Sequence, residues 1–217
     1  MSPIINKFGT RFAWIDTVLK EHKRWEKMPN RQDPVTNDII EFCIDSAVGH
    51  NRNSLKAAMK DWLILGEYTG FRLSEWAQEQ KNTKGGRFAI HDPTIGGDGS
   101  SKAFILEDFR MFGTKNKRIN NSAVKIFKDS EVDPISICWT FQKNKDNGQH
   151  IKYTRNKQAP RRCPVKAGLR IRARAQRLKV LPGIPITVYK DDQGCIKYIT
   201  DKDIESILQT ISKNVYN

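Results

Sequence analysis

Cysteine is scarce in this chain, and the four cysteines form no recognisable pair. Cys43, Cys138, Cys163 and Cys195 are widely separated, with no Cys-x-x-Cys spacing and no adjacent histidine. This spacing argues against the common zinc modules and gives no disulfide framework. We therefore expect no metal and no disulfide, and mostly packed, reduced thiols of the kind found in intracellular proteins.

Long apolar runs are missing as well. No hydrophobic segment approaches the ~20 residues that cross a bilayer, and the first residues show no signal-peptide pattern. The glycine-rich stretch 96–101 lacks the Gly-Lys-Ser/Thr ending of a phosphate-binding loop, and no helix directly follows it. The sequence therefore predicts neither a membrane partner nor a nucleotide cofactor.

Acidic residues are outnumbered by basic ones. The 217 residues include 38 Lys and Arg against 24 Asp and Glu, for a net charge of +14. With 38% hydrophobic residues, the chain can bury a core in one large domain with at most a small appendage. The charge balance favours a polyanionic partner, with nucleic acid ahead of an anionic membrane surface.

Hydrophobic periodicity gives the expected order of elements. Residues 1–32 form an approach segment, and 33–217 form the domain. The expected elements are a helix starting near Pro34, a helix from about Ser54, strands over 104–112, 135–141 and 149–154, a helix over 164–178, a short hairpin over 186–199 and a helix from Thr200. Helices, a small antiparallel sheet and further helices in that order are typical of a mainly helical α+β fold.

One nine-residue stretch carries the most specific signal. Residues 68–76 read Tyr-Thr-Gly-Phe-Arg-Leu-Ser-Glu-Trp, follow a predicted amphipathic helix and place Arg72 just after Gly70. A guanidinium donates paired hydrogen bonds to two phosphate oxygens. Alternatively, Gly70 simply caps the helix and Arg72 lies on the surface. The stretch resembles the first arginine box of the tyrosine recombinases (the phage-integrase family), which reads Thr-Gly-(Leu or Phe)-Arg-x-Ser-Glu.

A second motif lies on the predicted hairpin between strands 135–141 and 149–154. Asp146-Asn147-Gly148 is a hairpin turn signal, and Lys143 and Lys145 lie close to it. Lysines at such tips are commonly solvated turn charges. In the tyrosine recombinases, however, a lysine on a β-hairpin after the first arginine box protonates the leaving oxygen. The resemblance assigns that role to Lys143, with Lys145 as the second choice.

The segment after the hairpin is strongly basic. Residues 163–167 read Cys-Pro-Val-Lys-Ala, which resembles the helix start in eukaryotic integrase-like proteins such as those of diatoms. Residues 161–179 contain eight basic side chains and no acidic one. Such crowded charges repel unless an anion neutralises them, and a DNA backbone would do so. The alternative is a solvated helix face whose arginine stems cover the core. The predicted DNA-binding residues are Lys145, Arg161, Arg162, Lys166, Arg170, Arg174 and Arg177.

The chain departs from the family beyond this point. The second box of the family is His-x-x-Arg, and none of the four histidines has an arginine three residues later. Tyr189, Tyr198 and Tyr216 lie in no recognisable nucleophile context. In the family, a helix like 200–216 precedes the second box. We therefore expect a partial catalytic domain that lacks the nucleophile.

The resemblance implies DNA recombination and integration, with strand breakage and rejoining that need no metal or nucleotide. A tyrosine attacks the backbone phosphate, Arg72 stabilises the phosphoryl oxygens and Lys143 protonates the leaving oxygen. Expected partners are double-stranded DNA and further copies of the chain on that DNA, in the nucleus if the host is eukaryotic. Without the nucleophile, the chain is expected to be inactive alone. Two alternatives remain open: a non-catalytic basic nucleic-acid-binding α+β module, and an unrelated basic protein that binds RNA.

Overall fold

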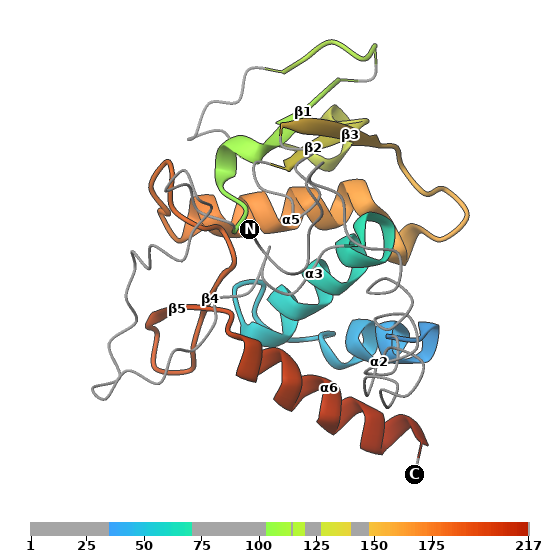
Figure 1. Cartoon of the computed structure of the whole chain (residues 1–217), viewed down its shortest axis with the longest axis vertical. Coiled ribbons are helices and arrows are strands. Elements are labelled where there is room, and N and C mark those ends of the chain that lie inside the picture. Colours follow the sequence, from blue (N-terminus) through green and yellow to red (C-terminus); the bar gives the residue numbers. More distant parts are fainter. Residues whose placement is uncertain (1–34, 71–102, 114, 120–126, 140–147, 217) are drawn as a thin grey trace, which may run out of the picture. The chain divides into compact units, whose positions relative to one another are not determined.

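The computed structural model describes residues 35–70, 103–113, 115–119, 127–139 and 148–216 (Figure 1). One compact unit runs from Thr36 to Asn217, and Met1–Val35 forms a separate unit. The predicted approach segment, residues 1–32, lies outside the described residues. Every helix and strand of the described residues belongs to the unit Thr36–Asn217.

Two helices open this unit and pack against each other. α2 spans Asn37–Ser46, and α3 spans Leu55–Thr69. Ser54 caps α3, because its hydroxyl oxygen accepts a hydrogen bond from the backbone N–H of Ala57 at 3.4 Å. The helix predicted to start near Pro34 begins at Asn37, and Val35 before it is 42% exposed.

Three strands form an antiparallel sheet in the order β1-β2-β3. They are β1 (Phe109–Met111), β2 (Ile135–Trp139) and β3 (Gln149–Tyr153). β2 forms within the strand predicted over 135–141, and its Ile135, Ile137 and Trp139 are 0%, 0% and 5% exposed. Alternate residues of a strand point to the same side, so these three contact the core together.

The strand predicted over 104–112 is mostly wrong. A 3₁₀ turn, η1 (Leu106–Asp108), occupies its centre, and only Phe109–Met111 forms β1. The carboxylate of Asp108 accepts a hydrogen bond from the backbone N–H of Ile105 at 2.9 Å, which stabilises the turn. A second 3₁₀ turn, η2 (Asp129–Glu131), leads into β2.

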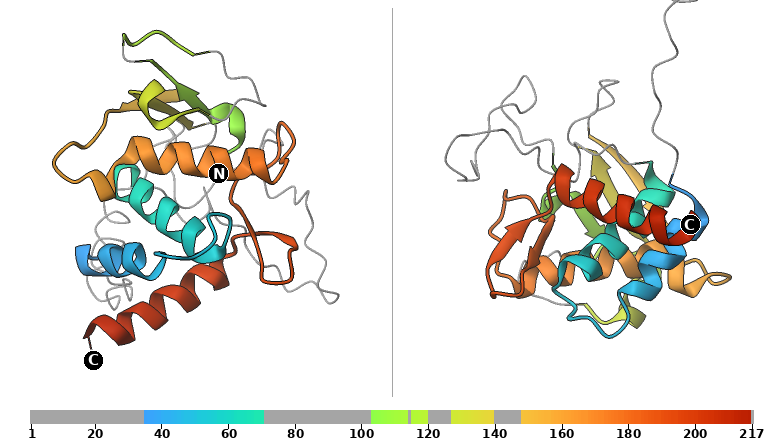
Figure 2. Two further views of the ribbon diagram at one scale, coloured as in Figure 1. Left: turned by 180° about the vertical axis from the view of Figure 1, so that it is seen from behind. Right: turned by 90° about the horizontal axis from the view of Figure 1, so that it is seen from below.

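The central helix, α5 (Pro164–Arg177), packs along α3 and against the inner face of the sheet (Figures 1 and 2). A 3₁₀ turn, η3 (Pro160–Arg162), precedes it, and Pro164 occupies its first turn, where a missing N–H costs nothing. Gly168 faces the sheet: a Cβ there would lie 2.6 Å from Cδ1 of Ile135. Its lack of a side chain therefore lets β2 approach α5 closely.

The chain ends with a short hairpin and a helix. The hairpin pairs β4 (Val188–Lys190) with β5 (Ile196–Tyr198), and α6 spans Asp201–Tyr216 and packs on α2. Two reciprocal hydrogen bonds cap the start of this helix, which the sequence predicted from Thr200. The Thr200 hydroxyl oxygen accepts from the Asp203 N–H at 3.1 Å, and the Asp203 carboxylate accepts from the Thr200 N–H at 2.9 Å.

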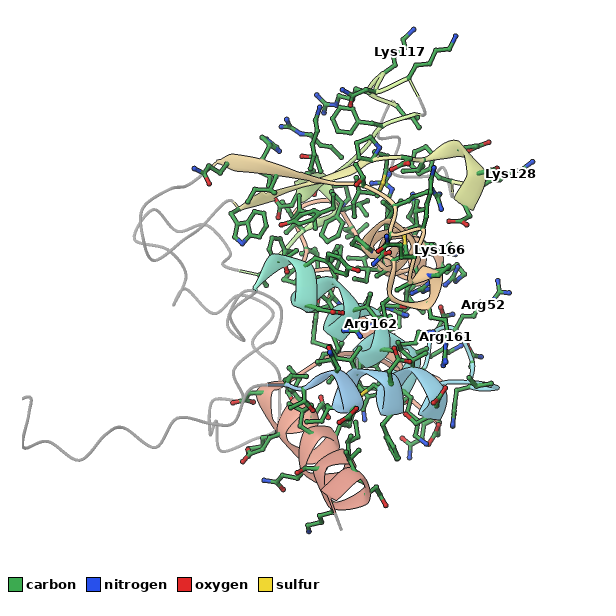
Figure 3. The ribbon with its side chains drawn as sticks, turned by 90° about the vertical axis from the view of Figure 1, so that its right-hand side faces the viewer. Arg52, Lys117, Lys128, Arg161, Arg162 and Lys166 are labelled. Atoms are coloured by element: carbon green, nitrogen blue, oxygen red, sulfur yellow. The ribbon has the colours of Figure 1, made fainter. Side chains whose placement is uncertain are left out.

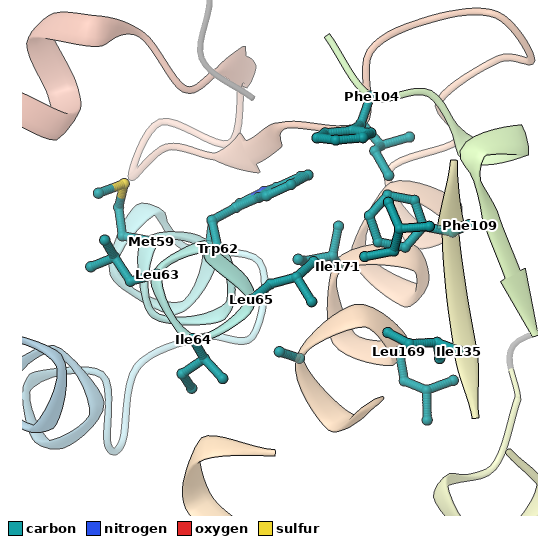
Figure 4. Packing of buried hydrophobic residues seen from close by; sticks show 14 of the residues in the cluster. Met59, Trp62, Leu63, Ile64, Leu65, Phe104, Phe109, Ile135, Leu169 and Ile171 are labelled. Carbon is teal, nitrogen blue, oxygen red and sulfur yellow. The ribbon is translucent and has the colours of Figure 1, made fainter. Parts of the chain in front are cut away.

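An aromatic cluster joins the sheet to the helices (Figure 4). Trp62 of α3 stacks on Phe104 and meets the edge of Phe109, with ring centroids 6.2 Å apart in both pairs. Trp139 of β2 also meets Phe104, at 6.0 Å. Helix residues and strand residues thus share one core. The predicted mixed α+β class is confirmed at this coarse level.

Candidate nucleic-acid interface

The C-terminal end of α3 is fixed just before the arginine motif. Gly70 adopts a left-handed conformation (φ 64°, ψ 31°), and its N–H donates to the carbonyl of Gly66 at 2.8 Å. Glycine adopts this conformation without the steric cost of a Cβ. The Tyr68 hydroxyl oxygen accepts a hydrogen bond from Nδ2 of Asn156 at 2.6 Å, which ties the helix end to the segment after β3. Arg72 itself lies outside the described residues.

Hydrogen bonds also hold the end of the β2–β3 ribbon that is next to the lysine motif. Trp139 pairs with Gln149, and the N–H of Gly148 donates to the carbonyl of Trp139 at 2.7 Å. Gly148 has a φ of 80°, as the predicted Asn-Gly turn requires. Lys143 and Lys145 belong to residues 140–147, which lie outside the described residues. The ribbon therefore defines only where that connection begins and ends.

These two fixed ends face the same side of the unit. In Figure 3, the end of α3 that leads to residue 71 and the ends of β2 and β3 that bound residues 140–147 lie on the left. Arg52, just before α3, and Lys128, before β2, are labelled on the right. The view from below in Figure 2 agrees. The convergence of Arg72 and Lys143 stays a prediction. The described chain ends that lead to them lie on a common side of the unit.

The basic stripe of α5 has an internal anion that the sequence analysis missed. Asp61 of α3 accepts a hydrogen bond from Nε of Arg170 at 2.5 Å and another from Nη2 of Arg174. The side chains of Asp61 and Arg174 are only 1% and 2% exposed. A carboxylate of the chain itself therefore supplies part of the neutralisation that the sequence analysis assigned to DNA. The Arg174 side chain therefore points into the fold and does not belong to an exposed DNA-binding surface.

The remaining predicted residues of α5 stay nearer the surface. Arg177 is exposed, and its Nε donates to the side-chain oxygen of Asn53 at 3.1 Å. Lys166 lies 3.9 Å from the carboxylate of Asp129, and its side chain is 35% exposed. An exposed ion pair contributes little to stability, so Lys166 can exchange Asp129 for a phosphate oxygen. Arg177 is bound only to a neutral amide oxygen there, which a phosphate oxygen can replace.

Arg161 and Arg162 are held by acidic residues of the two neighbouring helices. Arg161 pairs with Asp45 and Glu41 of α2, while Arg162 pairs with Glu67 of α3. Nη2 of Arg162 also donates to the side-chain oxygen of Asn37 at 2.7 Å. These contacts pin η3 onto α2 and α3, so structural anchoring accounts for both residues without a ligand. The Arg161 side chain is nevertheless 57% exposed.

The outer face of the sheet carries a basic row that the sequence analysis overlooked. Arg110 of β1 and Lys152 of β3 flank Ser136 in register, and His150 lies two residues from Lys152 on the same face. Burial lowers the pKa of His150, and the charges of Arg110 and Arg118 lower it further. The period-two spacing of His150 and Lys152 is the one sequence signal that could have indicated this face.

Two tyrosines after the basic helix are poor nucleophiles in this fold. Burial is the main cause that raises the pKa of both Tyr189 and Tyr198. An attacking phenol needs the opposite shift, or an adjacent base. Tyr189 is also 7% exposed and belongs to the hydrophobic core. This agrees with the absence of a nucleophile context in the sequence around them.

Comparisons with known proteins add no relative. No known protein family, no curated protein and no solved structure matches this chain. Among the described residues, no helix combines the length and the apolar character needed to cross a bilayer.

Proposed function

We propose that this chain binds duplex DNA and carries part of a tyrosine-recombinase catalytic site. Arg72 contacts the non-bridging oxygens of one backbone phosphate, and Lys143 contacts the leaving oxygen of the same phosphate. The observation that carries the proposal is that two described chain ends lie on one side of the unit. The α3 end before Arg72 and the ribbon end before Lys143 face the same side of the unit.

The net charge of +14 supports the DNA half of this proposal. Neutralising backbone phosphates releases bound counterions, so affinity must fall steeply with salt. We expect duplex affinity, measured by fluorescence anisotropy, to fall roughly 100-fold or more between 50 and 200 mM salt. An affinity that is flat over this range, or that clearly favours single-stranded RNA, would leave the basic RNA-binding alternative.

The catalytic half of the proposal is tested by cross-linking positions 72 and 143, because the isolated chain is not expected to cleave DNA. Cysteines introduced at Arg72 and Lys143, with Cys138 and Cys195 changed to Ser, should be joined by a short bismaleimide. The matched control pairs position 72 with a cysteine at Lys128. Lys128 lies on the side of the unit opposite the C-terminal end of α3 (Figure 3). Efficient joining of 72 to 143 and none of 72 to 128 is the expected result. Equal or absent joining of both pairs would contradict the recombinase proposal.

A non-catalytic DNA-binding module is the second candidate. The observation that favours it is the basic row of Arg110, Lys152 and His150, which lies on the face of the sheet opposite Ile135 and Ile137. Such a module would show the same salt dependence. It would differ in the cross-linking test, where positions 72 and 143 need not meet.

A further inference from the structure

A pocket of about 460 Å³ opens between α3 and α5. The loop between α2 and α3 contributes His50 and Arg52 to its wall, α3 contributes Lys60 and Asp61, and Asp129 and Phe127 lie on the far wall. The basic stripe of α5 forms the remaining wall with Lys166, Arg170, Arg174 and Arg177. Arg52 and Lys166 lie on the same side of the unit, opposite the ends that lead to Arg72 and Lys143 (Figure 3).

The pocket holds more positive charge than its own carboxylates can balance. Six Lys and Arg side chains line it, against the two carboxylates of Asp61 and Asp129, which leaves four positive charges. Asp61 already binds both Arg170 and Arg174, and Nζ of Lys60 is 4.0 Å from the same carboxylate. One carboxylate thus faces three cations.

The pKa shifts of two lining groups agree with this excess of positive charge. Burial lowers the pKa of Lys60, and Arg170 and Arg174 lower it further although Asp61 opposes them. Burial also lowers the pKa of Arg177, with Arg174 and Arg52 adding to the effect. Positive charges that disfavour one another in this way are stabilised by an added anion.

The geometry suits a phosphate oxygen cluster better than a single halide. Asp61 holds Arg170 and Arg174 in fixed positions, so their guanidinium groups are oriented before any ligand arrives. Within the guanidinium of Arg170, Nε donates to Asp61, and this is the one contact shown for that group among the described residues. Its remaining N–H groups, with Lys60, Lys166 and Arg177, offer donors from two helices to several oxygens of one group.

We propose that this pocket binds a phosphate group, carried either by a nucleic-acid backbone or by a free phosphate compound. None of the described residues that line this pocket belongs to the two motifs, and the proposal does not depend on the role of Arg72 or Lys143. Phe127 and Leu169 supply an apolar wall for the part of the ligand that carries the phosphate. Asp61 is a positioning residue here, since it acts through the two arginines.

Calorimetric titration of the full chain with pyrophosphate tests the proposal, with sodium chloride at equal ionic strength as the blank. Arg177→Gln and Lys166→Gln each remove one lining cation from an accessible position. Each should weaken pyrophosphate binding about tenfold, the effect of losing one hydrogen bond from a charged group. Lys117→Gln is the matched control, because Lys117 is exposed and does not line the pocket.

Competition identifies the source of the phosphate. If a short duplex displaces pyrophosphate, the pocket binds backbone phosphate; if both bind together, it binds a free phosphate compound. Folded Arg177→Gln and Lys166→Gln variants that bind pyrophosphate like the wild type would overturn the proposal, as would an equal loss in Lys117→Gln. Failure of the 72–143 cross-link with pyrophosphate binding intact would refute the recombinase proposal alone.

Discussion

Asp61 and Arg174 form an ion pair whose two side chains are 1% and 2% exposed, although 113 residues separate them in the sequence. Burying a charge is costly unless a partner and hydrogen bonds compensate it. Arg174 meets this condition through Asp61 and through its Nε, which donates to the carbonyl of Arg52 at 3.1 Å. The pair therefore stabilises the contact between α3 and α5.

The first prediction follows from this pair. Asp61→Asn leaves Arg174 buried without its carboxylate and should lower the free energy of unfolding by about 3–5 kcal/mol. Urea denaturation followed by circular dichroism measures the loss. Asp129→Asn is the control, because the Asp129 side chain is 56% exposed and should change stability little. Equal stability of the two variants would contradict a structural role for Asp61.

The second prediction concerns the close approach of α5 to the sheet. Gly168→Ala places a methyl group 2.6 Å from Cδ1 of Ile135, which is fully buried and has little room to move. We expect a loss of about 1–3 kcal/mol in unfolding free energy.

A double-mutant cycle separates this clash from an effect of alanine on the helix itself. Ile135→Val removes the clashing Cδ1, so Gly168→Ala should cost much less in that background. Additive costs in the double variant would show that the contact is not the cause.

The third prediction is thiol reactivity. Burial raises the pKa of the Cys43 thiol from 9.0 to about 12. At pH 8, an alkylating reagent should therefore modify Cys195, which is exposed, and should reach Cys43 only after unfolding. Mass spectrometry of peptides from the folded and the urea-treated chain measures both, and rapid modification of Cys43 without urea would contradict the packing of α2.

The same group makes stability depend on pH. Below pH 9 the thiol is neutral in both the folded and the unfolded chain, so Cys43 adds no pH dependence. Between the unfolded value of 9.0 and the folded value of about 12, only the unfolded chain loses the proton. Its contribution to stability should therefore fall as pH rises through this window, and Cys43→Ala should reduce that fall.

The fourth prediction is the absence of covalent chemistry in the isolated chain. A nicked suicide duplex should yield no protein–DNA adduct on a denaturing gel. The raised pKa values of Tyr189 and Tyr198 support this expectation. An adduct that disappears in Tyr198→Phe or Tyr216→Phe, and persists in Tyr153→Phe, would show that the chain contains its own nucleophile.

Local patterns predicted much of the fold. The helix predicted from about Ser54 and the strand predicted from residue 135 both form, because their apolar residues repeat with the period of a helix and of a strand. Met59, Trp62 and Leu65 of α3 are at most 1% exposed. The expected strand over 104–112 is largely wrong because the Asp108 carboxylate satisfies a backbone N–H and favours a turn. An apolar run needs burial, and it can obtain burial without forming a strand.

Contacts between distant segments could not be predicted in the same way. Nothing near Asp61 in the sequence indicates that Arg170 and Arg174 neutralise it, because the pairing depends on how α3 and α5 pack. The pocket is a product of the same packing. Arg72 and Lys143 remain predictions from short motifs, and the described structure fixes only the helix end and the ribbon that precede them.

The distance in sequence between Asp61 and its two arginines also sets an order of events during synthesis. Arg170 and Arg174 follow Asp61 by 109 and 113 residues. A ribosome adding about 5–20 residues per second needs roughly 6–23 s to cover that interval. Throughout it, α3 is already made while its charged partners and the helix that covers its apolar face are not. During this period aggregation competes with folding of the nascent chain. The period ends only when α5 has emerged.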